Sequence, residues 1–379
     1  MQDIELEQAI EVLLAHTTPV TETERVPLLD ALGRVAAEDV YAAFDNPPFD
    51  RSPLDGYTFA AVSTADASAE HPVRLTVVGE ECAGDFFAGA VGAGECVRIM
   101  TGGAIPAGCD CVVRQEDVRE EGTAIFVPFT SQPFENYCYA GEDIKKDTLL
   151  LAKGQRIRAS QIAVLASEGH ADVCVHRRVR IAVASTGDEL LQPGEPLRPG
   201  KIYNSNLYLL AGRLKELGAE VTVVGSVPDD VDRAAEVIAS YADRVDLFLT
   251  SGGVSVGKKD IMHGVVPALG AERLFWRVCM KPGAPAIAYT RGRMLGIALS
   301  GNPFAAYATF ELMARPAIAR LAGETDVLMP RRRAVLADAF PKPCHGRRFL
   351  RARMEADGRV SLPDQHASGS LFSAAGCDA

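Results

Sequence analysis

Acidic side chains follow three of the apolar segments between residues 179 and 323, each at the point where the segment ends. "IAVAS" leads into "TGDEL", "VTVVGSV" leads into "PDD", and "DLFLT" leads into "SGGVSVGKKD". The acids in these places are Asp188, Glu189, Asp229, Asp230 and Asp260. Glycine- and serine-rich loops expose backbone N–H groups that suit a phosphate, whereas carboxylates at the same edge repel one. A hard cation such as Mg²⁺, bound between the carboxylates and the phosphate oxygens, would remove this repulsion and let a phosphate bind at the same edge.

An ordinary structural role also fits each of these acids taken singly. An Asp that precedes a helix or lies in its first turn caps the helix and stabilises it by about 1 kcal/mol. The glycines have such a role too, because many turns need a residue with positive φ. Three acidic groups at strand ends, with Ser-Gly-Gly directly after a buried strand, favour a binding site over caps and turns alone.

The segment 251–260 resembles a phosphate-binding P-loop but breaks its pattern. Gly252, Gly257 and Lys258 satisfy G-x-x-x-x-G-K, but the next position needs a Ser or Thr hydroxyl for Mg²⁺ and holds Lys259. A Walker site would also need an Asp that closes another apolar strand, and "LGIALSG" has none. Asp260 stands where a carboxylate could supply an oxygen ligand instead. The segment is therefore predicted to be a different kind of anion site.

These loops need a scaffold, and the region 179–323 alternates strand and helix patterns. "VRIAVAST", "EVTVVGSV", "VDLFLT" and "RMLGIAL" read as apolar strands, with helix patterns between them and a long one over 304–321. In one of these helices Leu207, Leu210, Leu214 and Leu217 share a face. The alternation predicts a doubly wound, parallel α/β sheet. Ligands of such sheets bind outside the carboxyl ends of the strands.

The remaining patterns predict a multidomain α/β plus β protein. The chain reads as helical up to about residue 44, as a Pro-rich loop over 45–57, and as short strands between Gly and Pro turns over 72–128. A helix and a strand follow over 159–178. We predict a discontinuous N-terminal helical and linker domain (1–45 and 139–178), an inserted β-rich domain (46–138), an α/β domain (179–329) and a small C-terminal β domain (330–379).

Composition restricts the possible partners. The 379 residues carry a net charge of −11, which argues against non-specific binding to nucleic acid or to an anionic membrane. No apolar run approaches the roughly 18 residues of a membrane span, and the acidic N-terminus lacks the basic start of a signal peptide. The nine cysteines form no C-x-x-C pair. Their usage favours reduced thiols in a cytoplasmic protein over a disulfide framework or a zinc ribbon.

Ordered motifs give this chain a family resemblance. "SPLDGY", "RIMTGGAIPAGCDCVV", "GEDI", "STGDEL", "SGGVSVG", "KPG" and "GNP" stand in the order seen in the MoeA family of molybdopterin molybdenumtransferases, which resembles the E domain of gephyrin in animals. The resemblance covers residues from about 10 to 323. It implies insertion of molybdate into the dithiolene of adenylylated molybdopterin, with Mg²⁺-dependent release of AMP. It also implies a homodimer whose site lies between the α/β domain of one subunit and the β domain of the other. A molybdopterin adenylyltransferase is the implied upstream partner, which would supply the adenylylated molybdopterin.

The resemblance also implies roles for individual residues. The acids expected to organise the molybdate and pyrophosphate end are Asp188, Glu189, Asp229 and Asp260, with the metal held by Glu189, Asp229 and Asp260. The expected anion cradle consists of Ser251, Gly252, Gly253 and Ser255. Loops of the smaller domains would bring in Asp55, Thr101 and Asp143. Further contacts with the pterin and its substituents are expected at Asn204, Ser205, Lys281, Asn302 and Pro303.

Three of these residues also have a purely structural alternative. Asp55 could cap a turn, Thr101 could be a threonine at a strand end, and Ser205 fits a helix N-cap. The chain also departs from the family pattern. "SGNP" and "KPGAP" replace the common PGNP and KPGKP, so Ser300 stands for a proline and Ala284 for a lysine, and "ENYCYA" replaces a segment that usually carries arginines. Each missing cation would weaken a charge-assisted anion contact by about 1–3 kcal/mol.

Two other functional classes are compatible with parts of the sequence. A MoeA-like paralogue could act as a carrier or scaffold for molybdopterin or the molybdenum cofactor, with reduced or altered activity, for example toward tungstate. The complete acid set favours the enzyme over this alternative. A nucleotide-dependent dehydrogenase would need G-x-G-x-x-G after the first strand, and "STGDELLQPG" does not supply it.

Overall fold

The computed structural model describes residues 1–255, 257, 260–340 and 346–377. The chain forms two compact units. Unit 1 comprises Met1–Glu38, Lys153–Ile162 and Asp172–Ala379, and unit 2 comprises Asp39–Ala152 and Ala163–Ala171. The boundaries of the four domains expected from the sequence are finer than this division and stay predictions. None of the helices in the described part of the chain is long and apolar enough to cross a bilayer.

Unit 1 is built on a seven-stranded sheet with the order β1-β17-β18-β19-β16-β12-β15. Four neighbouring strands run parallel and coincide with the predicted ones, namely β12 (Arg180–Thr186), β15 (Glu220–Val227), β16 (Leu247–Ser251) and β19 (Met294–Leu299). The mixed α/β class is thereby confirmed. The other three strands were not predicted; they are β1 (Gln2–Ile4), β17 (Glu272–Val278) and β18 (Ile287–Arg291).

Strand β18 runs antiparallel to both of its neighbours, so the sheet is mixed and not parallel throughout. Two of the missed strands, β1 and β17, have weak local patterns. β1 has only three residues, and β17 carries Glu272, Arg273 and Arg277 among its seven residues. Alternation of apolar and polar residues is the main sequence signal for a strand, and neither segment shows it.

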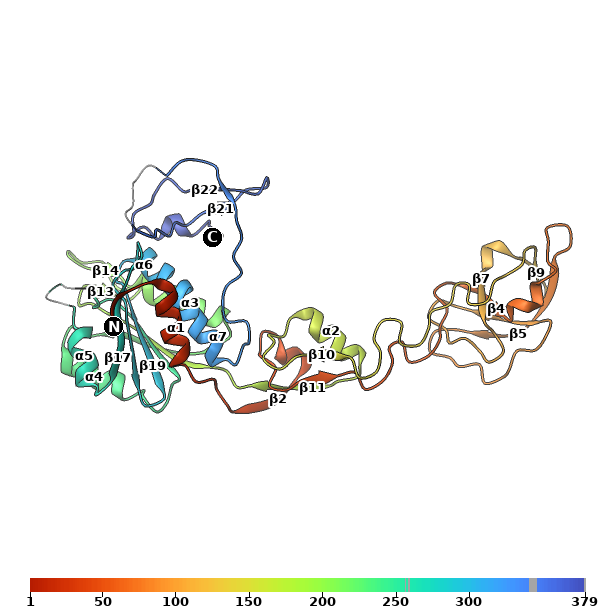
Figure 1. The fold of residues 1–379 in the computed structure, drawn as a ribbon, viewed down its shortest axis with the longest axis horizontal. Coiled ribbons are helices and arrows are strands. Elements are labelled where there is room, and N and C mark those ends of the chain that lie inside the picture. Colours follow the sequence, from red (N-terminus) through yellow and green to blue (C-terminus); the bar gives the residue numbers. More distant parts are fainter. Residues whose placement is uncertain (256, 258–259, 341–345, 378–379) are drawn as a thin grey trace. The chain divides into compact units, whose positions relative to one another are not determined.

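Helices cover both faces of this sheet (Figure 1). One face carries α1 (Leu6–Ala15), α3 (Ser205–Glu216), α6 (Pro303–Thr309) and α7 (Arg315–Leu321), and the other carries α4 (Val231–Ala239) and α5 (Met262–Ala268). Phe248 and Leu249 of β16 belong to the cores on opposite faces, as the alternation of side chains along a strand requires. The helix expected over 304–321 is one helical run in which a π-helical turn, Phe310–Ala314, joins α6 to α7.

The N-terminal region is less helical than predicted. Within residues 1–45 the one α-helix is α1, whereas Thr23–Pro27 is strand β2, which pairs with β11 (Asp172–His176), and Leu28–Ala31 is a 3₁₀ turn. The apolar residues after Pro27 fit a helical spacing, but only five residues separate Pro27 from Gly33. So short a helix is unstable without a buried face, and Leu29 is 81% exposed.

The C-terminal segment folds against the α/β sheet and its helices. Its short strands are β20 (Val335–Leu336), β21 (Arg353–Met354) and β22 (Arg359–Ser361), in the order β20-β22-β21. Phe304 N at the start of α6 donates to Ser368 O at 2.9 Å. Lys281 N donates to Arg347 O at 2.9 Å, and Lys281 O accepts from Phe349 N at 2.8 Å. The segment is therefore part of the same compact unit.

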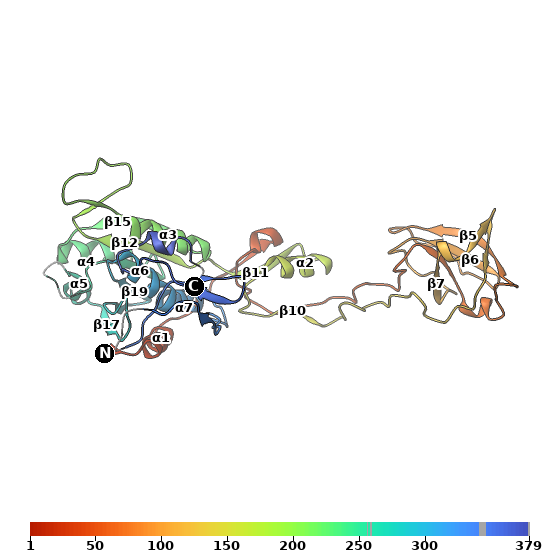
Figure 2. The same cartoon turned by 90° about the horizontal axis from the view of Figure 1, so that it is seen from above.

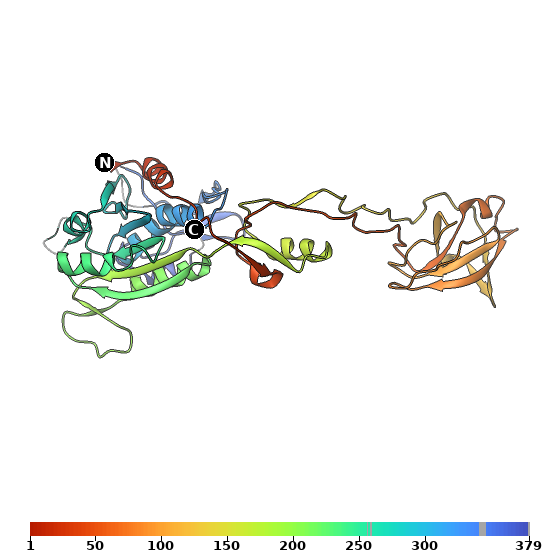
Figure 3. The ribbon, with the colours of Figure 1, turned by 90° about the horizontal axis from the view of Figure 1, so that it is seen from below.

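A loop between β12 and α3 projects beyond the sheet and is drawn in green in Figures 2 and 3. It carries β13 (Leu190–Leu191) and β14 (Ile202–Tyr203), which pair in parallel. Tyr203 Oη donates to Glu195 O at 2.9 Å.

Unit 2 contains a six-stranded sheet with the order β7-β4-β6-β5-β9-β8. The strands are β4 (Gly56–Phe59), β5 (Val73–Glu81), β6 (Glu95–Ile99), β7 (Cys111–Arg114), β8 (Arg119–Glu121) and β9 (Ala124–Val127). The strand-rich character expected for 72–128 is confirmed. Its core gathers Tyr57, Phe59, Leu75, Ile125 and Val127. Outside this sheet, β3 (Val40–Tyr41) pairs with β10 (Leu149–Leu151). Helix α2 (Ala159–Ser167) begins in unit 1 and ends in unit 2.

Candidate active site

The carboxyl ends of the four parallel strands lie at one edge of the unit 1 sheet. Their register pairs Thr186 with Val227, Ser185 with Ser251, and Ser251 with Leu299. The chain passes from β12 to β15 on one side and then to β16 on the other. The loops after β12 and β16 therefore lead to helices on opposite faces, α3 and α5. Such a reversal in strand order opens a crevice where ligands of α/β sheets bind.

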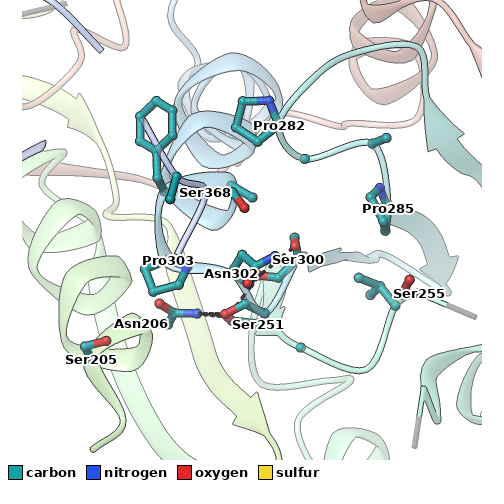
Figure 4. Close-up of a pocket in the computed structure, with 18 of the residues that line it drawn as sticks. Ser205, Asn206, Ser251, Ser255, Pro282, Pro285, Ser300, Asn302, Pro303 and Ser368 are labelled. Carbon is teal, nitrogen blue, oxygen red and sulfur yellow. Dashed lines mark hydrogen bonds between the residues drawn. The ribbon is translucent and has the colours of Figure 1, made fainter. Parts of the chain in front are cut away.

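A cavity of about 960 Å³ lies at this edge (Figure 4). This volume is at the upper end of the range for small-molecule sites. Its wall includes most of the residues that the sequence analysis singled out, namely Glu189, Asn204, Ser205, Asp229, Ser251, Gly252, Gly253, Ser255, Asp260, Lys281, Asn302 and Pro303. Lys258 and Lys259 lie outside the described residues.

The acids of the strand ends have different surroundings. Asp188 does not line the cavity: its N–H donates to Asp229 Oδ2 at 3.3 Å, and its carbonyl oxygen accepts from Lys201 Nζ at 2.6 Å. Asp230 Oδ1 accepts from Arg233 N at 2.9 Å and caps α4, so the structural alternative holds for this acid. Asp229, one position earlier, belongs to the cavity wall, and Asp260 Oδ2 accepts from Gly257 N within its own loop.

The three carboxylates expected to bind metal do not form a preassembled cluster. Within the ranges that the structure describes, no group of three or more His, Cys, Asp or Glu side chains could by itself hold a metal ion. Glu189, Asp229 and Asp260 instead reach the cavity from the loops after β12, β15 and β16. A cation bound here would need further ligands from its substrate or from water.

Glycine is required at the start of the anion cradle. Gly252 has a φ of +99° and Gly253 a φ of +69°, a region that residues with a side chain rarely adopt. A Cβ on Gly252 would also lie 2.6 Å from Thr186 Oγ1 and 2.8 Å from Thr186 O. The loop after β16 can thus approach the end of β12 only because this position has no side chain.

Hydrogen bonds join the first turn of α3, the end of β16 and the loop after β19 (Figure 4). Asn206 Nδ2 donates to Ser251 Oγ and to Gly301 O, both at 2.8 Å, and Ser251 Oγ donates to Ser300 O at 3.3 Å. Asn206 was not predicted as a site residue, although it stands two positions after Asn204, which was. In the described structure the N–H groups of Gly253, Val254 and Ser255 donate to no protein acceptor. These donors are therefore available to an anion in the cavity.

Asn204, and not Ser205, caps helix α3. Asn204 is 1% exposed; its Oδ1 accepts from Leu207 N at 3.3 Å, and its amide lies within hydrogen-bond distance of Ser185 Oγ. The N-cap alternative for Ser205 is therefore wrong. Ser205 is the first residue of the helix, is exposed and lines the cavity (Figure 4).

The C-terminal segment supplies cations and aromatic rings to the cavity wall, which was not predicted. Arg348 and Arg351 are, with Lys281, the lysines and arginines that line the cavity among the described residues. Arg351 is 4% exposed, its guanidinium lies 4.2 Å from the centroid of the Phe304 ring, and its Nη2 donates to Ala367 O at 3.3 Å. The basic run "GRRFLRAR" was the available sequence signal, but nothing local connected it to the distant α/β loops.

In unit 2 the structure brings Asp55 and Thr101 together. Asp55 Oδ1 accepts from both Thr101 N and Thr101 Oγ1 at 2.7 Å, so the two residues form a pair across the ends of two loops. These bonds favour the ionised carboxylate and lower the pKa of Asp55. Asp143 is exposed on a third loop, where its N–H donates to Asn46 O at 3.1 Å.

A Thr101→Val substitution tests this pairing. We expect the pKa of the Asp55 carboxyl to rise toward its ordinary value, because the hydroxyl donor is lost while the backbone donor remains. Carboxyl-carbon NMR titration measures the change. Thr101→Ser keeps the hydroxyl and should leave the pKa as in the wild type. An equal pKa in all three proteins would show that the backbone N–H alone lowers it.

Two known protein families match separate parts of the chain. The family described as "MoeA N-terminal region (domain I and II)" matches residues 4–169, and the one described as "Probable molybdopterin binding domain" matches residues 182–320. A molybdopterin molybdenumtransferase of Bacillus subtilis is 40% identical over 344 residues, which cover 89% of this chain and 80% of that protein. One from Staphylococcus aureus is 38% identical over 331 residues, with coverage of 86% and 78%.

A solved structure extends the likeness to three dimensions. The crystal structure of the molybdopterin biosynthesis MoeA protein from Pyrococcus horikoshii matches with a TM-score of 0.84 at 31% identity, covering 98% of this chain and 92% of that one. The sequence likeness to the bacterial relatives spans most of both proteins in each comparison. The chain therefore belongs to the MoeA family of molybdopterin molybdenumtransferases.

Proposed function

We propose that this protein inserts molybdate into the dithiolene of adenylylated molybdopterin and releases AMP. The observation that carries the proposal is the cavity at the carboxyl edge of the unit 1 sheet. One wall combines backbone N–H groups, carboxylates and cations, which together suit a phosphate-containing substrate and a second oxyanion. The name of the family, molybdopterin molybdenumtransferase, describes the transfer of molybdenum to molybdopterin, and the adenylylated form of the substrate and the release of AMP are part of the proposal.

We place the phosphate end of the substrate at the anion cradle. The N–H groups of Gly253 and Ser255 would donate to phosphate oxygens, and Lys281, Arg348 and Arg351 would offset the negative field of a protein with a net charge of −11. Donors fixed in advance stabilise developing negative charge without reorganisation during the reaction. The chain thus needs no nucleophile of its own, because its main task is to hold two anions in reacting positions.

Mg²⁺ would be held by Glu189, Asp229 and Asp260 together with oxygens of the substrate. The ion usually binds through one or two carboxylates plus phosphate oxygens and keeps several waters, so carboxylates on separate loops around a cavity fit it. When bound, it would neutralise charge at the phosphoanhydride. Asp188 would act indirectly, because its N–H holds the Asp229 carboxylate.

We place the pterin along Ser205, Asn302 and Pro303, which line the cavity beside the cradle (Figure 4). Asn204 would shape this wall without contacting the ligand through its amide, since that group is engaged by the cap and by Ser185. We also place the protein in the cytoplasm and assign a molybdopterin adenylyltransferase as the source of its substrate.

The proposal includes a homodimer in which Asp55, Thr101 and Asp143 of one copy complete the cavity of the other. The family resemblance is the reason for this assignment. The Asp55–Thr101 pair supports it, because a carboxylate kept ionised by two donors suits contact with a metal or a polar substrate group.

The deciding experiment is an AMP-release assay. Purified protein is incubated with adenylylated molybdopterin and Mg²⁺, with and without molybdate, and AMP is quantified by chromatography. We expect AMP release that depends on molybdate, together with a product that activates an apo-molybdoenzyme. Tight substrate binding without AMP release would instead support the carrier or scaffold. Release with tungstate but not molybdate would support the altered paralogue.

Restoring the family lysine at Ala284 should strengthen substrate binding. Ala284 lines the cavity, so Ala284→Lys adds a cation near the anionic substrate. We expect KM for adenylylated molybdopterin to fall by about tenfold at low salt, and by less at 0.5 M salt, where charges are screened. Ala284→Met matches the length without the charge and should not lower KM. An unchanged KM in the lysine variant would mean that the existing cations already saturate the site.

A further inference from the structure

The segment that carries the anion cradle is held from behind by two aromatic side chains that do not line the cavity. Trp276 of β17 donates from Nε1 to Val254 O at 3.2 Å. His263 of α5 lies with Nε2 at 3.1 Å from Ser255 O, and because a carbonyl oxygen only accepts, this nitrogen carries the proton. The two rings meet edge to face with centroids 4.6 Å apart.

Trp276 is itself rigidly placed. β17 lies between β1 and β18, and Trp276 pairs with Gln2 on one side and with Ile287 on the other. Its side chain packs against the apolar core between the sheet and helices α4 and α5. The indole N–H therefore has a fixed position, set by three strands and a packed core.

Glycine-rich backbone needs such an external restraint. Gly252 and Gly253 can adopt more conformations than other residues, so the cradle would not hold one shape by itself. A trans peptide places its C=O and N–H on opposite sides of one plane. Fixing Val254 O against Trp276 thus directs the N–H of Ser255 away from Trp276, and fixing Ser255 O against His263 restrains the adjoining peptide.

We propose that Trp276 and His263, called the latch below, are positioning residues that preorganise the anion cradle. They hold two consecutive carbonyl groups of the loop after β16 and so set the affinity of its N–H groups for the phosphate end of the substrate. The inference rests on the proposed function, because the cradle is assigned to phosphate there. It adds the two residues outside the cavity that give the cradle its shape.

Trp276 is the only tryptophan in the chain, so its fluorescence reports on the loop after β16 that it contacts. Inorganic pyrophosphate with Mg²⁺ is titrated into the wild-type protein while tryptophan emission is followed, and a saturable change is expected. His263→Leu removes one donor of the latch and should weaken pyrophosphate binding about tenfold, which is about 1.4 kcal/mol. His263→Gln retains an N–H donor and should stay within about twofold of the wild type.

Trp276→Phe keeps an aromatic ring but loses the indole N–H, and its binding is measured by calorimetry. We expect a loss of about tenfold or more in pyrophosphate affinity. Tyr241→Phe is the matched control, because Tyr241 packs against Phe248 in the same core and makes no hydrogen bond to the described part of the loop. With adenylylated molybdopterin as substrate, His263→Leu and Trp276→Phe should each raise KM about tenfold and change kcat less than threefold.

The outcomes separate this inference from the proposed function. Wild-type affinity in both His263→Leu and Trp276→Phe would overturn the latch and leave the transferase standing. Equal weakening in His263→Leu and His263→Gln would also overturn it, because the donor would then be irrelevant. If the wild type binds no pyrophosphate, the cradle is not a phosphate site and the latch is wrong, whereas AMP release still decides the proposed function on its own.

Discussion

Replacing Asp229 by Asn should lower molybdate-dependent AMP release by about 10²–10³-fold, because a carboxylate of the cavity wall loses the charge that would hold the metal. Asn keeps the size of the side chain and an acceptor oxygen for Asp188 N. The loss should therefore fall on catalysis and not on folding. Raising the Mg²⁺ concentration should recover part of the rate if the variant is impaired in metal binding.

The neighbouring residue provides the matched control. Asp230 has the same chemistry one position later, but its carboxylate caps α4 through Arg233 N. Asp230→Asn retains a good capping group and should leave AMP release within about twofold of the wild type. Equal losses in the two variants would contradict the assignment, because they would point to a general electrostatic effect of the loop. A fully active Asp229→Asn would remove this residue from the mechanism.

Replacing Gly252 by Ala should both destabilise the protein and abolish phosphate binding at the cradle. The φ of +99° disfavours any side chain, and the new Cβ would lie 2.6 Å from Thr186 Oγ1. Strain of this kind and the forced shift of β12 or its loop together cost about 2–4 kcal/mol. The expected results are a thermal unfolding midpoint several degrees lower and no saturable pyrophosphate binding.

A second glycine shows whether the effect is specific. Gly212 lies within α3, where an added Cβ meets nothing within 4 Å. Gly212→Ala should be neutral or stabilising by up to about 1 kcal/mol, because alanine loses less entropy in a helix. Its pyrophosphate affinity should match the wild type. A Gly252→Ala protein that melts and binds like Gly212→Ala would contradict the close approach of the two loops.

Local sequence patterns determined the parallel strands and the loops that follow them. β12, β16 and β19 are largely apolar runs between turns, and such runs specify buried strands without reference to the rest of the chain. β15 is the edge strand of the sheet and is only partly buried, but its valines still mark it as a strand. The carboxyl ends of parallel strands share one edge of a sheet. For this physical reason, the strand pattern alone is enough to expect Glu189, Asp229 and Ser251 around one cavity.

Other features depend on contacts between residues far apart in the sequence. Local pattern could not decide that Asp230 caps a helix while Asp229 faces the cavity, because the two adjacent acids differ only in which way the backbone turns them. It also could not place β1 beside β17, since three residues carry no periodicity.

The tertiary structure alone decided what surrounds the strand-end loops. Arg351 reaches the cavity because the C-terminal segment packs on α6, and Trp276 reaches Val254 because β17 joins the sheet beside β18. These contacts arise from the packing of whole elements, which depends on the shape and burial of both partners. The sequence by itself thus determined the chemistry at the strand ends, and the fold decided which distant side chains complete and restrain it.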